Sequence, residues 1–145
     1  MTSRISDANV ARFAPHALAA LRIVAAALFL AHGLVKLVGF PVGAPPGEQP
    51  LVTLLGLAGV VETITGALMI LGLFTRSAAL IASGEMAVAY WLFHAPRSIY
   101  PVANGGDAAI LFCFVFLYIA VAGPGVLSLD RLRDRFSMEG RLSEA

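Results

Sequence analysis

Four long apolar blocks alternate with shorter, more polar stretches along this 145-residue chain. The blocks cover residues 17–40, 51–74, 77–95 and 107–125. Each approaches the roughly 20 residues that an α-helix needs to cross the hydrocarbon core of a bilayer. Because a bilayer offers no water to backbone groups, spanning segments must be helices or closed barrels, and the two-residue alternation of barrel strands is missing here. The pattern predicts an all-α integral membrane protein, a four-helix bundle whose membrane domain covers 17–125.

The connections between the blocks predict how the helices follow one another. The stretch 41–50 holds four prolines and two glycines, so we expect an irregular loop there. The connection GLFTRS, at 72–77, is so short that the second and third helices must form an antiparallel hairpin. Asp107 begins the fourth block, where a carboxylate in the first turn complements the helix dipole.

The composition supports a membrane protein and excludes several other classes. Apolar residues make up 59% of the chain and charged residues 13%, against about 45–50% and about 25% in soluble domains. The net charge is +1, and basic residues of the tail 126–145 alternate with acidic ones, which predicts a short solvated helix rather than a nucleic-acid interface. Cys113 is the only cysteine in the sequence, which excludes an intrachain disulfide and a CxxC redox pair.

The arginines predict the orientation of the chain in the membrane. Most of them lie at the front of the first block, in the connection 72–77 and in the tail, whereas the other two loops contain only Arg97. By the positive-inside rule both termini, including the N-terminal segment 1–16, then face the cytoplasm. Arg22 would interrupt the apolar region of a cleavable signal peptide, and three more spans follow, so we expect an uncleaved first helix.

Six ionisable residues lie within the predicted spans. A charge at the centre of a spanning helix costs about 2.5 to 3.5 kcal/mol of insertion free energy. Arg22 and Lys36 lie near helix ends, from which long side chains can extend to the membrane surface. Glu62 and Glu85 lie near the middle of their blocks, and a short carboxylate stem cannot reach the surface from there. The six residues are Arg22, His32, Lys36, Glu62, Glu85 and His94.

Helical geometry predicts that these groups meet inside the bundle. Small residues surround Glu62 and Glu85 on their helices, which favours the close approach of a neighbouring helix. Arg22, His32 and Lys36 fall within an arc of roughly 80° on the first helix. In an antiparallel arrangement His32 lies only about 6 Å from the depth of Glu62, so we expect a contact between them. We also expect Arg22 to extend toward Glu85, while Lys36 either joins Glu62 or stays at the membrane surface.

Two interpretations of such buried pairs compete. They can be structural polar clamps between helices, or they can form a buried acid–base site, since ionisable clusters inside a membrane often serve proton transfer or ligand binding. In the second interpretation Glu62 and His32 are the catalytic groups and exchange protons with a quinone-like carbonyl, and the other four ionisable residues complete the ligand site or polar cluster. We expect no metal site. Haem ligation by His32 and His94 is not expected either, because they lie at different depths and the sequence contains no CxxCH attachment motif.

Three stretches of the sequence carry a resemblance to a known family. They are LRIVAAALFLAHGLVKLVGF, GLAGVVETITGALMILGLFTRSAAL and GEMAVAYWLFHAPRSIYPVANGGDAAILFCFVFLYIAVAGPGVLSLD. In this order they resemble the DoxX family of small bacterial four-helix membrane proteins, from Leu21 to about Asp130. Asp107 departs from the pattern, because relatives more often carry glutamate there. The matching residues are Arg22, His32, Gly33, Lys36, Glu62, Gly66, Arg76, Glu85, Met86, His94, Asn104, Gly105 and Gly106.

The resemblance implies a location and a range of functions. A bacterial member lies in the plasma (inner) membrane as a multi-pass protein, with the lipid bilayer around it. The family takes its name from association with a thiosulfate:quinone oxidoreductase, and its members are described as membrane oxidoreductase components. This implies a quinone-linked redox component, with a quinone as its ligand and a redox enzyme subunit or a second copy of the chain as its partner. A non-catalytic scaffold or assembly partner of a redox enzyme, and a small proton or solute conductor, are the alternatives.

Overall fold

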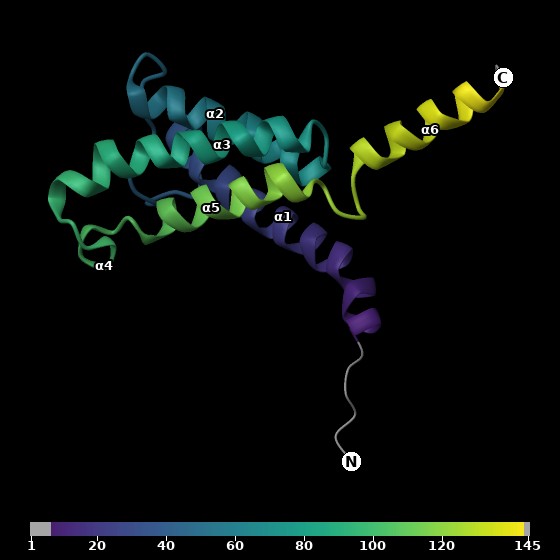
Figure 1. Ribbon diagram of the computed structural model, residues 1–145. Coiled ribbons are helices and arrows are strands. Elements are labelled where there is room, and N and C mark those ends of the chain that lie inside the picture. Colours follow the sequence, from purple (N-terminus) through teal and green to yellow (C-terminus); the bar gives the residue numbers. More distant parts are fainter. Residues whose placement is uncertain (1–6, 144–145) are drawn as a thin grey trace.

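The computed structural model describes residues 7–143, and these form helices joined by turns and loops (Figure 1). Five helices are long: α1 Asp7–Val38, α2 Leu54–Leu71, α3 Thr75–Ala89, α5 Asp107–Ala122 and α6 Leu129–Ser143. Three short elements lie between α3 and α5: the π-helical turn η1 Tyr90–His94, the 3-10 turn η2 Ala95–Arg97 and the single turn α4 Pro101–Asn104. The described part of the chain is therefore all-α, as predicted.

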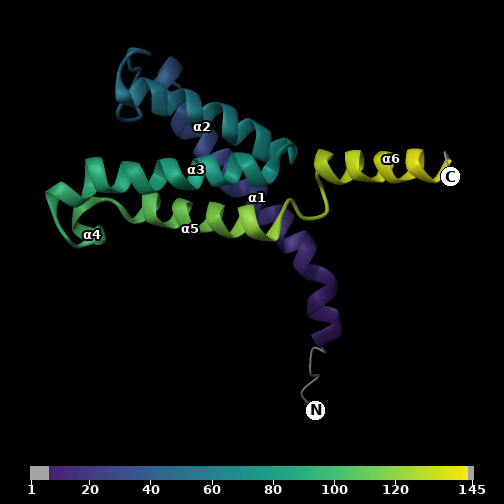
Figure 2. The same cartoon turned by 45° about the horizontal axis from the view of Figure 1, so that its top comes forward.

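The helices α1, α2, α3 and α5 pack side by side. α1 lies along α2, α3 lies along α5, and α2 and α3 form the predicted antiparallel hairpin. We call the end of the bundle with residues 72–74 and 123–128 the turn end, and the end with residues 39–53 and 98–106 the loop end. Figures 1 and 2 show α6 and the first part of α1 extending beyond the bundle at the turn end.

The contact between α1 and α2 depends on glycines. A Cβ atom on Gly33 would lie 2.4 Å from Thr63 Oγ1, and one on Gly66 would lie 3.1 Å from Leu30 Cα. The small-residue face around Glu62 is therefore the face that α1 approaches, as predicted. On α3 the expectation fails at Gly84, because a Cβ there would meet nothing within 4 Å.

Aromatic and aliphatic side chains fill the centre of the bundle. Phe29 of α1 meets Phe116 of α5 edge-on, with ring centroids 4.9 Å apart, and both are fully buried. The hydroxyl of Ser83 donates a hydrogen bond to the carbonyl of Cys113 at 2.8 Å, which links α3 to α5. The sole cysteine of the sequence thus lies at a helix contact.

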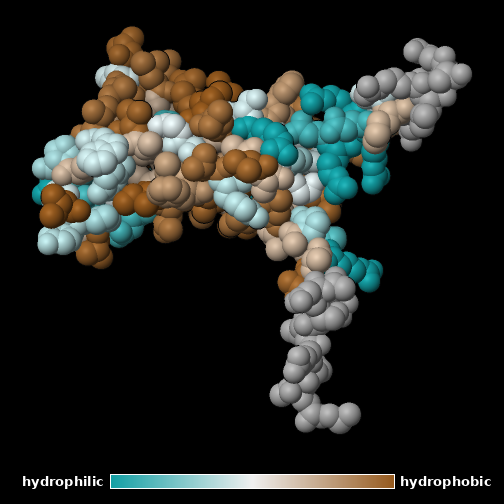
Figure 3. Space-filling model, in the orientation of Figure 1, coloured by the Kyte–Doolittle hydropathy of each residue, from teal (hydrophilic) through white to brown (hydrophobic). Residues whose placement is uncertain are grey.

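The outer surface of the bundle is apolar. Large hydrophobic side chains such as Leu57, Ile81 and Phe114 are more than half exposed. Figure 3 shows hydrophobic residues over the bundle and hydrophilic ones gathered where α6 begins. Within residues 7–143, three helical stretches are long and apolar enough to cross a membrane, Val10–Val38, Leu54–Leu71 and Thr75–Arg97. The apolar helix α5 is shorter, at 16 residues.

Helix boundaries follow local hydrogen bonding more closely than the ends of the apolar blocks. α2 begins at Leu54 because Thr53 caps it, accepting the N–H of Gly56 at 3.0 Å. It ends at Gly72, whose left-handed φ of 67° stops the helix. Phe74 also has a positive φ, 49°, and the carboxylate of Asp130 holds this turn by accepting the N–H groups of Phe74 and Thr75, each at 2.9 Å.

Candidate ligand-binding site

A cavity of about 470 Å³ lies among α1, α2, α3 and α5 toward the loop end. Its volume falls within the roughly 300–1,000 Å³ of small-molecule sites. Phe29, Phe93, Phe112 and Met86 supply apolar walls. The ionisable side chains that line it are His32, Lys36, Glu62, Glu85, His94 and Arg97. Five of the six ionisable residues selected from the sequence therefore surround one cavity.

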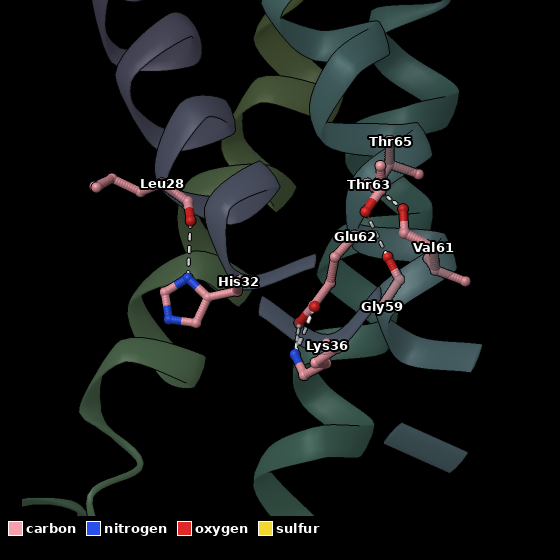
Figure 4. Close-up of polar contacts among 8 residues, drawn as sticks. All are labelled: Leu28, His32, Lys36, Gly59, Val61, Glu62, Thr63 and Thr65. Carbon is pink, nitrogen blue, oxygen red and sulfur yellow. Dashed lines mark hydrogen bonds and ion pairs between the residues drawn. The ribbon is translucent and has the colours of Figure 1, made fainter. Parts of the chain in front are cut away.

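Lys36 and Glu62 form an ion pair across the contact between α1 and α2. The Lys36 ammonium donates to both carboxylate oxygens of Glu62, each 2.5 Å away. Their side chains are 12% and 2% exposed, so the pair is almost entirely buried. Figure 4 shows the two side chains pointing toward one another. Of the two alternatives for Lys36, the structure has the one in which it joins Glu62.

His32 lies on the cavity wall but does not hydrogen-bond to Glu62. Its Nδ1 is 2.8 Å from the carbonyl oxygen of Leu28, one turn back on the same helix (Figure 4). Its ring meets Phe112 edge-on, with centroids 5.8 Å apart. The expected His32–Glu62 contact is wrong as a hydrogen bond, because His32 Nδ1 is engaged by the Leu28 carbonyl and Lys36 is the α1 residue that bonds the Glu62 carboxylate.

Glu85, on α3, has a different environment in the cavity wall. Both of its carboxylate oxygens are buried, and neither has a hydrogen-bond partner among residues 7–143. A buried polar group without a partner costs about 1–3 kcal/mol of stability, and more if it is charged. Such a group is explained when a ligand supplies the missing partner.

His94 reaches the cavity through the π-helical turn. In a continuous α-helix the nine residues after Glu85 would place His94 about half a turn away, on the opposite face. The π-turn Tyr90–His94 is wider and rotates less per residue, so His94 lines the same cavity as Glu85. The His94 ring stacks on Tyr90 at 6.4 Å, and its Nδ1 lies 3.2 Å from the carbonyl oxygen of Asn104.

Arg22 lies away from the cavity and does not approach Glu85. It is fully buried at the turn end, where its guanidinium donates to the carbonyls of Met69, Ile70, Pro124 and Leu127. The expected contact with Glu85 is wrong, because Glu85 lies ten residues, or about 15 Å, along α3 from its turn-end start. The alternative in which Arg22 extends to the membrane surface is also wrong, because the whole residue is buried within the bundle.

Comparisons with known proteins identify the family. The family model described as DoxX matches residues 17–95, more than half of the chain. The chain belongs to the DoxX family. The match includes His32, Lys36, Glu62, Glu85 and His94, which line the cavity. The predicted resemblance is confirmed.

Two relatives of this DoxX protein extend over most of its length. An uncharacterized protein of Haemophilus influenzae is 42% identical over 126 residues, which cover 84% of this chain and 94% of that protein. The inner membrane protein YqjF of Escherichia coli is 29% identical over 127 residues, 79% of this chain and 89% of that protein. No solved structure matches the chain. With several helices able to cross a bilayer, this DoxX protein is a multi-pass inner membrane protein, as predicted.

A second cavity, of about 680 Å³, lies at the turn end between α1, α3, α5 and α6. Two of its charged residues already serve the fold. Arg76 donates to the carbonyls of Ala120 and Val121 at the end of α5, and Asp130 accepts the N–H groups that begin α3. The loop-end cavity gathers five ionisable residues of the predicted spans, including the unpartnered carboxylate of Glu85, and we take it as the candidate site of this DoxX protein.

Some parts of the site were not selected from the sequence. Arg97 and the loop residues Pro45 and Pro46 line the cavity together with the predicted residues. Arg97 carried one signal, since it is the only basic residue in the two loops that are otherwise free of arginine and lysine. No sequence signal pointed to the two prolines, because a proline-rich loop predicts irregular structure but not which part of the protein the loop covers.

The arrangement has the chemistry of an acid–base and hydrogen-bonding site. The cavity wall combines a neutralised pair, Lys36 and Glu62, with two imidazoles and the unpartnered Glu85. Within the part of the chain that the structure describes, no group of three or more His, Cys, Asp or Glu residues is placed to hold a metal ion. The side chains present can bind an organic ligand and exchange protons with it.

Proposed function

We propose that this DoxX protein is a component of a membrane redox system that binds a quinone or a similar small redox ligand in the loop-end cavity. The observation that supports this most is the cavity itself, which gathers five ionisable residues of the predicted spans among aromatic walls. A bound quinone supplies redox chemistry at its two ring oxygens. The DoxX protein supplies the site that holds the ring and the groups that exchange protons with those oxygens.

The lining residues fit an aromatic ring with polar oxygens. Phe29, Phe93 and Phe112 offer apolar and aromatic surface, which small-molecule sites commonly provide together with a few polar groups. Glu85 needs a hydrogen-bond partner that the described residues do not provide. A ligand with oxygens at opposite ends of a ring can contact Glu85 and the Lys36–Glu62 pair at once.

Lys36 and Glu62 act together in this proposal. Two of the three ammonium protons of Lys36 are donated to Glu62, so one remains for a ligand oxygen. Glu62 holds the ammonium in place and balances its charge inside the membrane. His32 is the neighbouring proton-exchanging group, because its Nε2 is not used by the hydrogen bond to Leu28.

A binding experiment tests the function. The full chain is reconstituted in nanodiscs, and binding of a short-chain benzoquinone is measured by equilibrium dialysis, with protein-free nanodiscs correcting for partition into lipid. We expect saturable binding that weakens at least tenfold in Glu62→Gln and is unchanged in Glu48→Gln, whose carboxylate is exposed in the loop 39–53 outside the cavity. Binding that is not saturable, or whose affinity is unchanged in Glu62→Gln, contradicts the proposal.

The proposed membrane topology has four crossings, with α5 as the fourth and both termini in the cytoplasm. α5 spans about 24 Å at 1.5 Å per residue, somewhat less than the roughly 30 Å core, and carries no charge after Asp107. The arginine distribution supports the orientation. Single cysteines at Ser98 and Ser137, in a Cys113→Ala background, test it with a membrane-impermeant thiol reagent. Labelling from the periplasm at Ser98 and only after lysis at Ser137 is expected, and the reverse pattern excludes this orientation.

One alternative function has an observation of its own. Arg22 joins α1 to α2 and to the segment 123–128, and Lys36–Glu62 joins α1 to α2 again, so these groups also fit a scaffold that assembles with a redox enzyme. In a scaffold, Glu62→Gln lowers the melting temperature and the amount of assembled partner without any saturable quinone binding in the wild type. The nanodisc experiment therefore separates the two functions.

A further inference from the structure

The two histidines of the cavity are fixed in the same tautomer. His32 Nδ1 lies 2.8 Å from the Leu28 carbonyl oxygen, and His94 Nδ1 lies 3.2 Å from the Asn104 carbonyl oxygen. A carbonyl oxygen can only accept, so each Nδ1 carries the proton. In the neutral rings Nε2 is then a bare acceptor, and for His32 Figure 4 shows it on the side of the ring away from Leu28.

Glu85 adds further acceptors to the same cavity. Both of its carboxylate oxygens are buried and unpartnered within residues 7–143. Even a protonated carboxyl keeps an oxygen that accepts a hydrogen bond. Among the residues that line the cavity, the groups without partners in the described chain are therefore mainly acceptors.

The donors of the cavity are fewer and partly committed. Lys36 gives two of its three protons to Glu62, which leaves one. Arg97 is exposed and lies beyond His94 toward the loop end. An oxidised ring with two carbonyl oxygens presents only acceptors, so it can hydrogen-bond to Glu85 only when that carboxyl carries a proton. A reduced ring with two hydroxyls presents donors as well, so it can hydrogen-bond to Glu85 whether or not the carboxyl is protonated.

We infer that the cavity binds the reduced, hydroxyl-bearing form of its ligand, a quinol, in preference to the quinone, with Glu85 accepting a ligand hydroxyl. This rests on the proposed function and makes it more specific. His32 or His94 accepts the second hydroxyl through Nε2, and the remaining Lys36 proton serves a hydroxyl oxygen. The hydrogen-bonding groups of the cavity then suit a ligand that donates hydrogen bonds better than one that only accepts them.

The test compares the two redox forms of one probe. The full chain in nanodiscs is dialysed anaerobically against a short-chain alkyl benzoquinol and, separately, against the matching benzoquinone. We expect the quinol to bind about tenfold more tightly, equivalent to about 1.4 kcal/mol. Glu85→Met keeps the side-chain volume and removes the acceptors, so it should abolish this preference by weakening quinol binding while quinone binding stays within twofold.

Controls separate the possible failures. Glu48→Met makes the same change in the exposed loop and should keep the quinol preference. The melting temperature of Glu85→Met should equal or exceed that of the wild type, because an unpartnered buried group has been removed. Equal binding of both forms, or tighter binding of the quinone, overturns this inference but agrees with the proposed function. Equal loss of both forms in Glu85→Met together with a lower melting temperature also overturns it. Binding of neither form to the wild type overturns the proposed function as well.

Discussion

The Lys36 ammonium lies 2.5 Å from both carboxylate oxygens of Glu62, and this pair joins α1 to α2 beside the ligand cavity. Gly59 allows the approach, because a Cβ there would lie only 2.8 Å from Lys36 Cβ. A buried ion pair of this kind need not stabilise a fold more than apolar residues of the same size, but breaking it leaves an uncompensated charge. Its role in stability can be separated from its role in binding.

Removing one member of this pair should destabilise the protein more than removing both. Glu62→Met leaves the Lys36 ammonium without its buried partner. We expect the free energy of unfolding to fall by about 3 kcal/mol. This is the lower end of the range for broken buried pairs, because the lysine stem can extend toward the membrane surface. Lys36→Met/Glu62→Met should recover most of this loss. Thermal unfolding of the wild type, Lys36→Met, Glu62→Met and the double variant in one detergent measures the cycle. A double variant less stable than Glu62→Met would contradict this expectation.

A methyl group at Gly33 should separate α1 from α2. In Gly33→Ala the new Cβ would lie 2.4 Å from Thr63 Oγ1 and 2.7 Å from Thr63 N, and the backbone nitrogen cannot rotate away. We expect a loss of about 1–3 kcal/mol, typical of an overpacked contact, seen as a lower melting temperature. The matched control is Gly84→Ala, where a Cβ meets nothing within 4 Å and the helix should gain up to about 1 kcal/mol. Equal effects of the two substitutions would contradict the proposed packing role of Gly33.

Lysine should not replace arginine at residue 22. The Arg22 guanidinium donates through all three of its nitrogens to carbonyls of α2 and of the segment 123–128, whereas a lysine has a single nitrogen. Arg22→Lys should leave at least one buried carbonyl unpartnered and cost about 2 kcal/mol or more. The control Arg12→Lys changes an exposed residue of α1 and should leave the melting temperature unchanged. If the melting temperature of Arg22→Lys equals that of the wild type, the several hydrogen bonds of the guanidinium are not needed for stability.

Asp130 should make the turn end sensitive to acid. Burial alone would raise the pKa of Asp130, but the N–H groups donated by Thr75 and Phe74 and the charge of Arg133 outweigh it and hold the pKa below its ordinary value of 3.8. A lowered pKa means that the stabilisation is complete above pH 3.8 and is lost as the pH falls below it through the folded-state value. At neutral pH, Asp130→Asn should cost about 1 kcal/mol, as the loss of a helix cap does.

Melting temperatures of wild type and Asp130→Asn between pH 2 and pH 7 check this dependence. The difference in melting temperature between the two proteins should be constant near neutral pH. It should disappear in strong acid, because the wild-type carboxylate is then protonated. Asp134→Asn, in the exposed part of α6, should follow the wild-type curve, since Asp134 accepts none of the hydrogen bonds that begin α3. A gap that persists unchanged at the lowest pH would show that the charge of Asp130 does not matter.

The sequence predicted the helices and most of the site, but not every partner. Five of six selected ionisable residues line one cavity, because a costly charge in mid-membrane must turn toward the protein interior. The pairings were harder to predict. His32 and Lys36 lie on one face, one turn or about 6 Å apart, so helical spacing left open which of them reaches Glu62. Arg22 shares that stripe, yet it binds backbone carbonyls, which have no side-chain signal in the sequence.

The sequence by itself determined that the chain is an all-helical membrane protein and that two of its ionisable residues, Glu62 and Glu85, have to turn toward the interior, because hydrophobic length and the cost of a buried charge are properties of each segment alone. Only the tertiary structure decided which ionisable residues pair with one another and which line the cavity. It pairs Lys36 with Glu62, leaves Glu85 without a partner in the described chain, and turns His94 into the cavity through a π-helical turn. These outcomes depend on helix tilt, side-chain reach and one irregular turn, which are fixed only when the helices pack against one another.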